Sequence, residues 1–345
     1  MSEVLRFCVP CQKLDKAPVP QKEGPLPRDR IELVKPFKAT GIDVLGPIGV
    51  KMGNRATHKR WVLLLTCMAT RAISLQPLKD MSTPTLINAL VKFHNTFPGL
   101  EIIYSDNGSN FKGACREIKE AVSAWNRQQI HEELRVQGVE WVWGPPNSPH
   151  WGGVYERLVR SAKRHLKFLL ERDYLPIDTF ETALTQVTSI LNSRPLTYAS
   201  TDVDDMRVLS PANFLYPYMI TPASCTIFPS TPADGDRMRS SWRDVRRLAD
   251  EFVDRWRKEY VATLLQRTKW RNTTKSPYEG QLVVITDEAT PRDKWKVARI
   301  DEVLSTDKNH VRRVRLTTAE GKSYERHLNK IIPLELEVGE EEEKG

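Results

Sequence analysis

Three acidic residues lie where the local pattern of apolar and polar residues changes abruptly. Asp43 interrupts the apolar segment GIDV, where an unpaired charge is costly. Asp106 ends the apolar run IIYS and is followed by NGSNF, which predicts a turn that starts a helix. Glu156 follows the Pro- and Gly-rich loop PPNSPHWGG and lies in the first turn of a predicted helix.

Each acid also has an ordinary structural explanation. Asp43 is compatible with a strand-end cap, Asp106 with an Asp-Asn-Gly turn, and Glu156 with a helix-dipole residue. Together, two strand-end aspartates and a helix-start glutamate can converge on one sheet edge. Such a set of oxygen ligands suits two Mg²⁺ or Mn²⁺ ions, which activate the attacking oxygen and stabilise the leaving one. The chemistry indicated is phosphoryl transfer on a nucleic acid, without a side-chain nucleophile.

A mixed α/β sheet is expected to position these acids. Alternating and buried apolar patterns predict strands over 38–45, 60–67, 72–77, 101–105 and 139–143. Helices are predicted after Ser82 or Thr83, ending at Pro98-Gly99, and over 111–135, 154–171 and 178–192.

The remaining segments predict a different organisation. The stretch 12–36 is rich in proline and charge and is typical of a linker, and 197–240 resembles an extended connector. Residues 242–264 carry one apolar stripe at helical spacing. Short alternating segments over 280–334 predict a small β-barrel, and the glutamate-rich tail 335–345 is typical of disorder.

The sequence around the three acids resembles the D,D,E signature of retroviral and retrotransposon integrases. The resemblance rests on GIDV at Asp43, YSDNGSNF at Asp106 and SPHWGGVYER at Glu156. The stretches WGPPNSPHWGG and LNSRPL, with the basic C-terminal region, resemble the BEL/Pao group of long-terminal-repeat retroelements. The resemblance implies a ribonuclease-H-like mixed sheet flanked by helices, a helical connector and a small SH3-like β-barrel.

This resemblance implies five parts. They are a truncated zinc-module remnant with a Pro-rich linker (1–36), the catalytic core (37–197), the connector with the long amphipathic helix (198–275), the DNA-binding barrel (276–334) and the acidic tail (335–345).

Two features depart from the family pattern. The stretch between Asp106 and Glu156 is longer than usual, which predicts a lengthened helical segment before Val139. Cys8 and Cys11 resemble half of a His-His-Cys-Cys zinc module. Because no histidine precedes His58, the tetrahedral ligand set is incomplete, and zinc is not expected in this chain.

Cationic residues follow Glu156 along one face of its predicted helix. They are Arg160, Lys163, Arg164 and Lys167. A charged face is most often simply solvated, but this one suits a phosphate backbone that leads to the acids. In the preceding loop, Asn147 and His150 are candidates to orient the substrate. The excess of 52 Lys and Arg over 44 Asp and Glu, a formal charge of +8, also favours a polyanionic partner.

The leading hypothesis is a polynucleotidyl transferase that processes DNA 3′ ends and integrates retroelement DNA into target DNA. The alternative is an inactive or host-recruited DNA-binding remnant, and a third is a cellular ribonuclease H or nuclease. The resemblance implies double-stranded DNA and further copies of the chain as partners. A nuclear location, with a cytoplasmic particle before it, follows from the substrate.

Cysteine content and hydropathy add two expectations. The five cysteines are an odd number without a regular framework, which favours a reducing compartment and no disulfides. The longest apolar run, near 61–66, is too short to span a membrane.

Overall fold

The computed structural model describes residues 35–52, 56–105, 116–143, 162–167, 170, 174–199, 205–216, 243–245, 247–253, 256, 277–286, 295–307 and 310–334. The chain divides into two compact units, Met1–Glu32 and Leu33–Gly345, and all described residues belong to the second.

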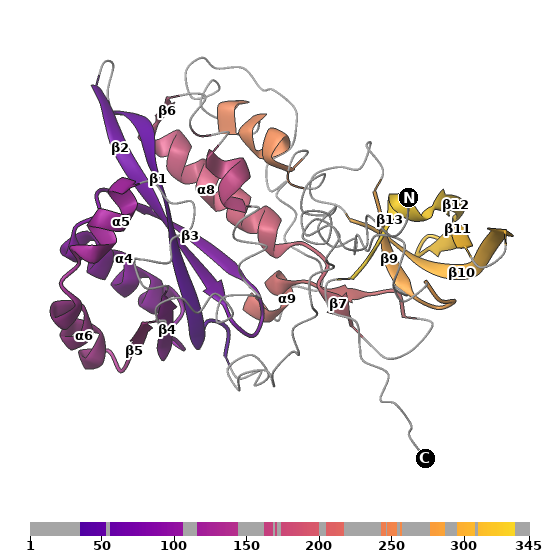
Figure 1. The fold of residues 1–345 in the computed structure, drawn as a ribbon, viewed down its shortest axis with the longest axis horizontal. Helices are drawn as coiled ribbons and strands as arrows, with labels where there is room; N and C mark the ends of the chain where they lie inside the picture. The colour runs from indigo at the N-terminus through magenta and orange to yellow at the C-terminus, as the bar shows by residue number, and fades with distance from the viewer. Residues whose placement is uncertain are drawn as a thin grey trace, which may run out of the picture. The chain divides into compact units, whose positions relative to one another are not determined.

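A six-stranded mixed sheet forms the N-terminal part of this unit (Figure 1). Its strands are β1 (Ala39–Met52), β2 (Ala56–Cys67), β3 (Ile73–Leu78), β4 (Ile102–Ser105), β5 (Glu140–Trp143) and the short β6 (Leu175–Pro176). The order is β3-β2-β1-β4-β5, and β6 pairs with β1. The first three strands are antiparallel, whereas β4 and β6 run parallel to β1 and β5 runs parallel to β4.

Helices cover both faces of this sheet (Figure 1). One face carries α4 (Thr83–Thr96), α5 (Arg116–Ser123) and α6 (Arg127–Val136), and α8 (Ile177–Asn192) lies on the other. As predicted, Ser82 caps α4 by accepting a hydrogen bond from the Thr85 N–H, and Pro84 lies in its first turn. The mixed α/β prediction for this part of the chain is confirmed.

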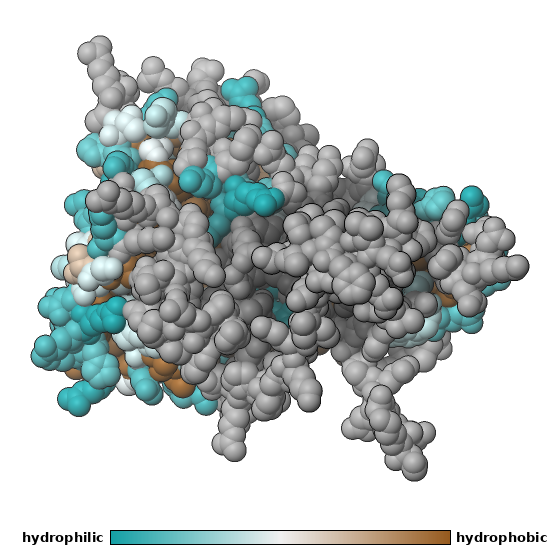
Figure 2. Space-filling view, in the orientation of Figure 1, coloured by the Kyte–Doolittle hydropathy of each residue, from teal (hydrophilic) through white to brown (hydrophobic). Residues whose placement is uncertain are grey.

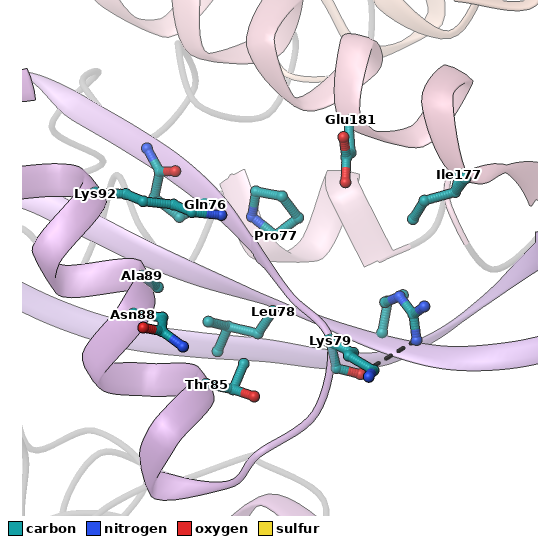
Figure 3. Close-up of a pocket in the computed structure, with 11 residues that line it drawn as sticks. Gln76, Pro77, Leu78, Lys79, Thr85, Asn88, Ala89, Lys92, Ile177 and Glu181 are labelled. Carbon is teal, nitrogen blue, oxygen red and sulfur yellow. Dashed lines mark hydrogen bonds between the residues drawn. The ribbon is translucent and has the colours of Figure 1, made fainter.

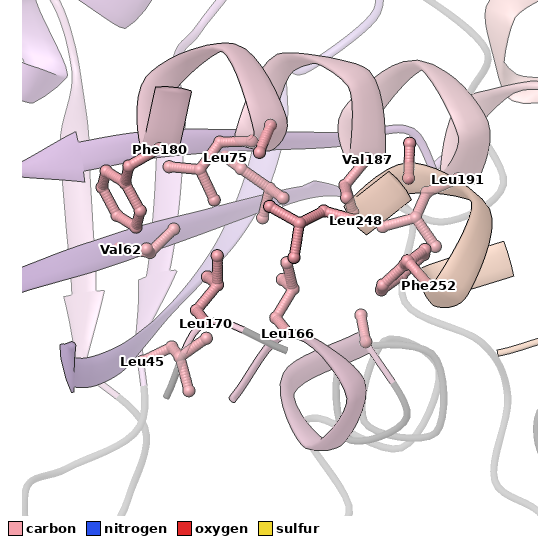
Figure 4. Close-up of a cluster of buried hydrophobic side chains, with 14 of the residues drawn as sticks. Leu45, Val62, Leu75, Leu166, Leu170, Phe180, Val187, Leu191, Leu248 and Phe252 are labelled. Atoms are coloured by element: carbon pink, nitrogen blue, oxygen red, sulfur yellow. The ribbon is translucent and has the colours of Figure 1, made fainter. Parts of the chain in front are cut away.

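Buried side chains on the α8 face join segments that are far apart in sequence (Figure 4). Leu166 and Leu170 pack with Val187 and Leu191 of α8, and Leu248 and Phe252 belong to the same cluster. The described parts of 243–256 are helical. The apolar stripe predicted for the long helix is therefore core, at least over Val245–Trp256.

The helical prediction for 111–135 was wrong in one respect. Two separate helices occupy its described part, because the chain turns at Ala124–Asn126. The Trp125 indole N–H donates to the Met81 carbonyl (2.8 Å), and the Asn126 side chain caps α6 by accepting from the Gln129 N–H (3.1 Å). The turn at 124–126 separates the two helices, and the Asn126 cap stabilises the start of α6.

The end of α8 is fastened to β3 through the motif LNSRPL. The Asn192 side chain accepts from the Ile73 N–H (2.7 Å) and donates to the Ile73 carbonyl (2.8 Å). Arg194, 1% exposed, donates to the Leu191 and Arg71 carbonyls. This motif thus has a structural role in the fold.

The segment expected to be an extended connector is partly folded where it is described. β7 (Thr197–Tyr198) pairs with β8 (Val208–Leu209), and the short helix α9 (Pro211–Leu215) follows. Ser210 and Asn213 form a capping box at its start.

A second, five-stranded antiparallel sheet lies in the C-terminal part. Its strands, in the order β12-β11-β10-β9-β13, are β9 (Leu282–Ile285), β10 (Lys296–Asp307), β11 (His310–Thr318), β12 (Ser323–His327) and β13 (Ile331–Pro333). A short 3-10 helix, η3 (Leu328–Lys330), precedes β13. The alternating segments 282–286, 295–303, 311–317 and 324–328 predicted four strands, and β13 was not among them. The closed SH3-like barrel stays a prediction.

Figure 2 shows both polar and apolar side chains on one face of the described part. Hydrophilic side chains gather over α6 in the view of Figure 2. Among the described residues, no helix is both long and apolar enough to cross a membrane. Cys67, predicted to be unpaired, is a buried free thiol.

Candidate active site

Asp43 lies within β1, where the buried pattern of the strand is first interrupted. Residues 39–42 are buried, whereas the Asp43 side chain keeps 23% of its surface exposed. One carboxylate oxygen accepts from the Val44 N–H (2.8 Å), and the other forms an ion pair with the Lys163 ammonium. An acid in an apolar strand is tolerated here because it is hydrogen-bonded, paired and partly solvated.

The strand register places the end of β4 beside Asp43. Ile42 lies opposite Ser105 in the parallel β1–β4 pair, and Ser105 lies opposite Trp143 in the β4–β5 pair. Asp43 directly follows Ile42 in the chain, and Asp106 directly follows Ser105. Asp43 therefore follows the β1 residue that pairs with the last residue of β4, and Asp106 comes next in the sequence.

The last residue of β4 is held by the neighbouring strand β5. The Trp141 indole N–H donates to the Ser105 hydroxyl at 2.7 Å, and both residues are buried. A buried donor and acceptor satisfied by each other fix the position of the strand end. No local pattern in the sequence predicts this bond, because it depends on the register between two strands.

The helical segment 162–167 brings a row of cations to Asp43. Ala162, His165 and Leu166 are buried, whereas Arg164 and Lys167 are exposed. Lys163 lies between these two groups, with 21% of its side chain exposed, and contacts Asp43. The sequence predicted Lys163 as a DNA-binding residue, and its ion pair with the candidate catalytic acid was not predicted.

A second cationic group lies at the end of β5. The Arg127 guanidinium lies over the Trp143 ring, 4.2 Å from its centroid, and the other neighbour of that ring is Trp141, stacked at 4.8 Å. Cation–π contact orients a guanidinium without neutralising it. Since Trp143 pairs with Ser105, this guanidinium belongs to the same end of the sheet as Asp43.

Most of the other predicted site residues lie outside the described residues. These are Asp106, Glu156, Asn147, His150, Arg160, Cys8 and Cys11. Within the described part, no group of three His, Cys, Asp or Glu side chains is arranged to hold a metal ion. Two of the three predicted metal ligands are not in that part, so the triad stays a prediction.

A family model matches the C-terminal part of the chain. Residues 240–334 match a family described as a family of unknown function (DUF5641). This range contains the second sheet and the described helical residues 243–256. No curated protein matches the chain.

The solved structures that match this chain include the following two. A simian T-cell lymphotropic virus intasome in complex with PP2A regulatory subunit B56 gamma aligns over 96% of this chain and 89% of its own, at 13% identity and a TM-score of 0.35. The catalytic core domain of BIV integrase aligns over 52% and 95%, respectively, at 15% identity and a TM-score of 0.33. Likeness at this level carries no functional argument, so function rests on the residues of the chain itself.

Proposed function

We propose that this chain is an integrase-type polynucleotidyl transferase, which processes DNA 3′ ends and joins them to target DNA. The observation that carries the proposal is the position of Asp43: its carboxylate contacts a cation and lies beside the end of the strand that leads into Asp106. The motifs YSDNGSNF and SPHWGGVYER supply the second aspartate and the glutamate.

The donor set fits a divalent metal ion. Asp43 offers a carboxylate that already neutralises a positive charge, the Lys163 ammonium. We expect Asp106 and Glu156 to complete an oxygen-ligand set of the kind that Mg²⁺ or Mn²⁺ prefers. Two bound ions would supply activation of the attacking oxygen and stabilisation of the leaving oxygen.

The neighbouring residues would bind and orient the DNA. The exposed side chains of Arg164 and Lys167 offer charge-assisted contacts to the phosphate backbone, without reading its sequence. We expect Lys163, which pairs with Asp43, to move to a DNA phosphate when metal ions bind that carboxylate. Trp141, through Ser105, would hold the strand that leads into Asp106.

Strand transfer by the purified chain tests this function. The substrate is a labelled duplex carrying the terminal sequence of the encoding element, with Mg²⁺ or Mn²⁺. We expect joined products that Asp106→Asn and Glu156→Gln each abolish, because either change removes a metal-binding carboxylate. Retention of joining in Asp106→Asn would rule out the mechanism.

The second candidate, a DNA-binding remnant without catalysis, predicts a different result in the same assay. Duplex DNA would bind to wild-type protein and to both variants alike, and no joined product would form with either metal. An RNA–DNA hybrid cut in preference to duplex DNA would instead favour a ribonuclease H.

A further inference from the structure

A pocket with a mixed polar and apolar lining opens beside β3, the outermost strand of the first sheet, between β3, α4 and α8 (Figure 3). Its volume is about 370 Å³. Three cations line it (Arg60, Lys79 and Lys92), together with the amides of Gln76 and Asn88 and one acid, Glu181. In Figure 3, Glu181 lies on α8, across the pocket from the side chains of α4.

Arg60 is the buried cation of this pocket. It is 9% exposed, and its guanidinium donates to the carbonyls of Lys59 (3.0 Å) and Lys79 (3.2 Å) and to the Met52 sulfur (2.8 Å). Within the described part of the chain, no carboxylate pairs with it. A buried guanidinium without a counter-charge is unfavourable, so an anion in the pocket would be stabilised.

The charges around Arg60 keep the pocket cationic. Lys79 and Lys92 are exposed, and neither forms an ion pair with a described residue. Glu181 is the one residue of the lining that carries a negative charge. Beyond the lining, Asp80 is a second acid, and hydrogen bonds from Ser82 and Thr85 hold its pKa below the usual value, so it is charged at neutral pH. The three cations still outnumber these two acids.

The edge of β3 does not suit an added peptide strand. The N–H and C=O of Ile73 point away from β2 and bond to Asn192. Along a strand, the backbone N–H and C=O groups of every second residue point to the same side. Pro77 therefore faces the same outer edge of β3 as Ile73, and proline has no N–H to donate there. A compact ligand therefore fits this edge better than an extended chain.

We propose that this pocket binds the phosphoryl group of a small phosphate or of a nucleic-acid phosphodiester. A phosphate monoester carries a charge of about −1.5 to −2 at neutral pH and three acceptor oxygens. Arginine, lysine and amide donors match those acceptors, and the volume is within the range of small-molecule sites.

This pocket is separate from the candidate active site. Asp43 lies on β1 opposite Leu64, whereas Arg60 lies further along β2, opposite Ile48. The pocket lies at the β3 edge, while β4 flanks the other side of β1. Phosphate binding in this pocket requires neither metal nor catalysis, and it is therefore independent of the proposed function.

Isothermal titration of the full chain without divalent metal tests the proposal, with inorganic phosphate and the dinucleotide d(TpT) as separate probes. We expect Lys79→Gln/Lys92→Gln to weaken binding of at least one probe about tenfold or more, because two charged donors are lost. The matched control is Lys35→Gln/Lys51→Gln, which removes the same charge from exposed positions outside the pocket lining. Glu181→Gln should tighten binding severalfold, because it removes a like charge.

The two probes distinguish the sources of the phosphoryl group. Binding of phosphate alone supports a small phosphate ligand, and tighter binding of d(TpT) supports a nucleic-acid backbone. The proposal is wrong if folded wild-type protein binds neither probe, or if the two double variants lose affinity equally. Neither result bears on strand transfer, which is measured with metal ions and with variants of Asp106 and Glu156.

Discussion

The residue at the centre of the candidate site has an environment built from three sequence-distant segments. Asp43 comes from β1, its ion-pair partner from the helical segment 162–167, and the adjacent strand end from β4. The sequence marked Asp43 as unusual because it interrupts an apolar strand. It did not indicate which cation pairs with it, because helical periodicity assigns a face to Lys163 but not a partner.

Replacing Lys163 with methionine should make the site bind divalent metal more tightly. Lys163 competes with any cation for the Asp43 carboxylate, and partly exposed ion pairs are worth about 0–1 kcal/mol, so the gain is at most about fivefold. Mn²⁺ titration followed by electron paramagnetic resonance measures it. Arg164→Met, which removes a cation from the exposed neighbouring position, is the control. Weaker Mn²⁺ binding in Lys163→Met would contradict the competition.

Trp141→Phe should reduce stability through one lost hydrogen bond. The change keeps an aromatic ring in the core but leaves the buried Ser105 hydroxyl without its 2.7 Å donor. An unsatisfied buried group costs about 1–3 kcal/mol. Urea unfolding measures the loss, and Ser105→Ala in the Phe background should then cost little more. Full additivity of the two changes would show that the bond contributes nothing.

Among the elements, β1 carries Asp43 and then changes register with β2 between Leu45 and Ile48. Gly46, at this irregularity, has φ of +141°, and a Cβ there would lie 2.6 Å from Trp61 Cδ1. Backbone conformation and packing both exclude a side chain at this position. Glycine here lets the strand bend while Trp61 packs against it.

Gly46→Ala should therefore destabilise the protein by more than Gly138→Ala. Gly138 also has a positive φ, +73°, but nothing lies within 4 Å of a Cβ placed there. We expect about 1–3 kcal/mol from backbone strain at either position, with the steric clash added only at Gly46. Thermal or urea unfolding of the two variants compares them. Equal losses would show that Trp61 moves aside without cost.

Asn192→Ala should loosen the junction between α8 and β3. Its amide satisfies both the N–H and the C=O of Ile73 in a buried position, and alanine would leave both groups without a partner. The expected cost is about 1–3 kcal/mol for each unsatisfied group. Hydrogen exchange at the Ile73 amide should rise with the fall in unfolding free energy. Unchanged protection of that amide would contradict the assigned role.

Prediction from the sequence succeeded for elements with a strong local signal. The apolar run WVLLLTC became β2, and Ser82 with Pro84 marked the start of α4. Prediction failed for elements whose boundaries or existence depend on tertiary contacts. The break between α5 and α6 depends on Trp125 reaching Met81, and the short strands β6 and β13 exist only through pairing with β1 and β9.

At the scale of the whole molecule, charge is the property that the sequence predicts most directly. The formal net charge of +8 needs no structure, but its distribution does. Some cations are engaged within the protein: Lys38 pairs with Glu101 and Arg315 with Glu302. Such pairs leave the net charge unchanged, but they show that composition does not say which cations face a polyanion. The exposed residues of the helical segment 162–167 are therefore more informative.

The affinity for duplex DNA should consequently fall as the salt concentration rises. The steepness of this fall, compared between variants, identifies the cations that contact DNA phosphates. Each phosphate contact contributes about 0.9 to the slope of log K against log salt concentration. We expect Arg164→Gln/Lys167→Gln to lower that slope by about 2, whereas Lys35→Gln/Lys51→Gln leaves it nearly unchanged. Fluorescence anisotropy between low and physiological salt, without divalent metal, measures both. If the two double variants gave the same slope, the charge would act as a diffuse property of the molecule, and the helix after Glu156 would have no special place in holding DNA.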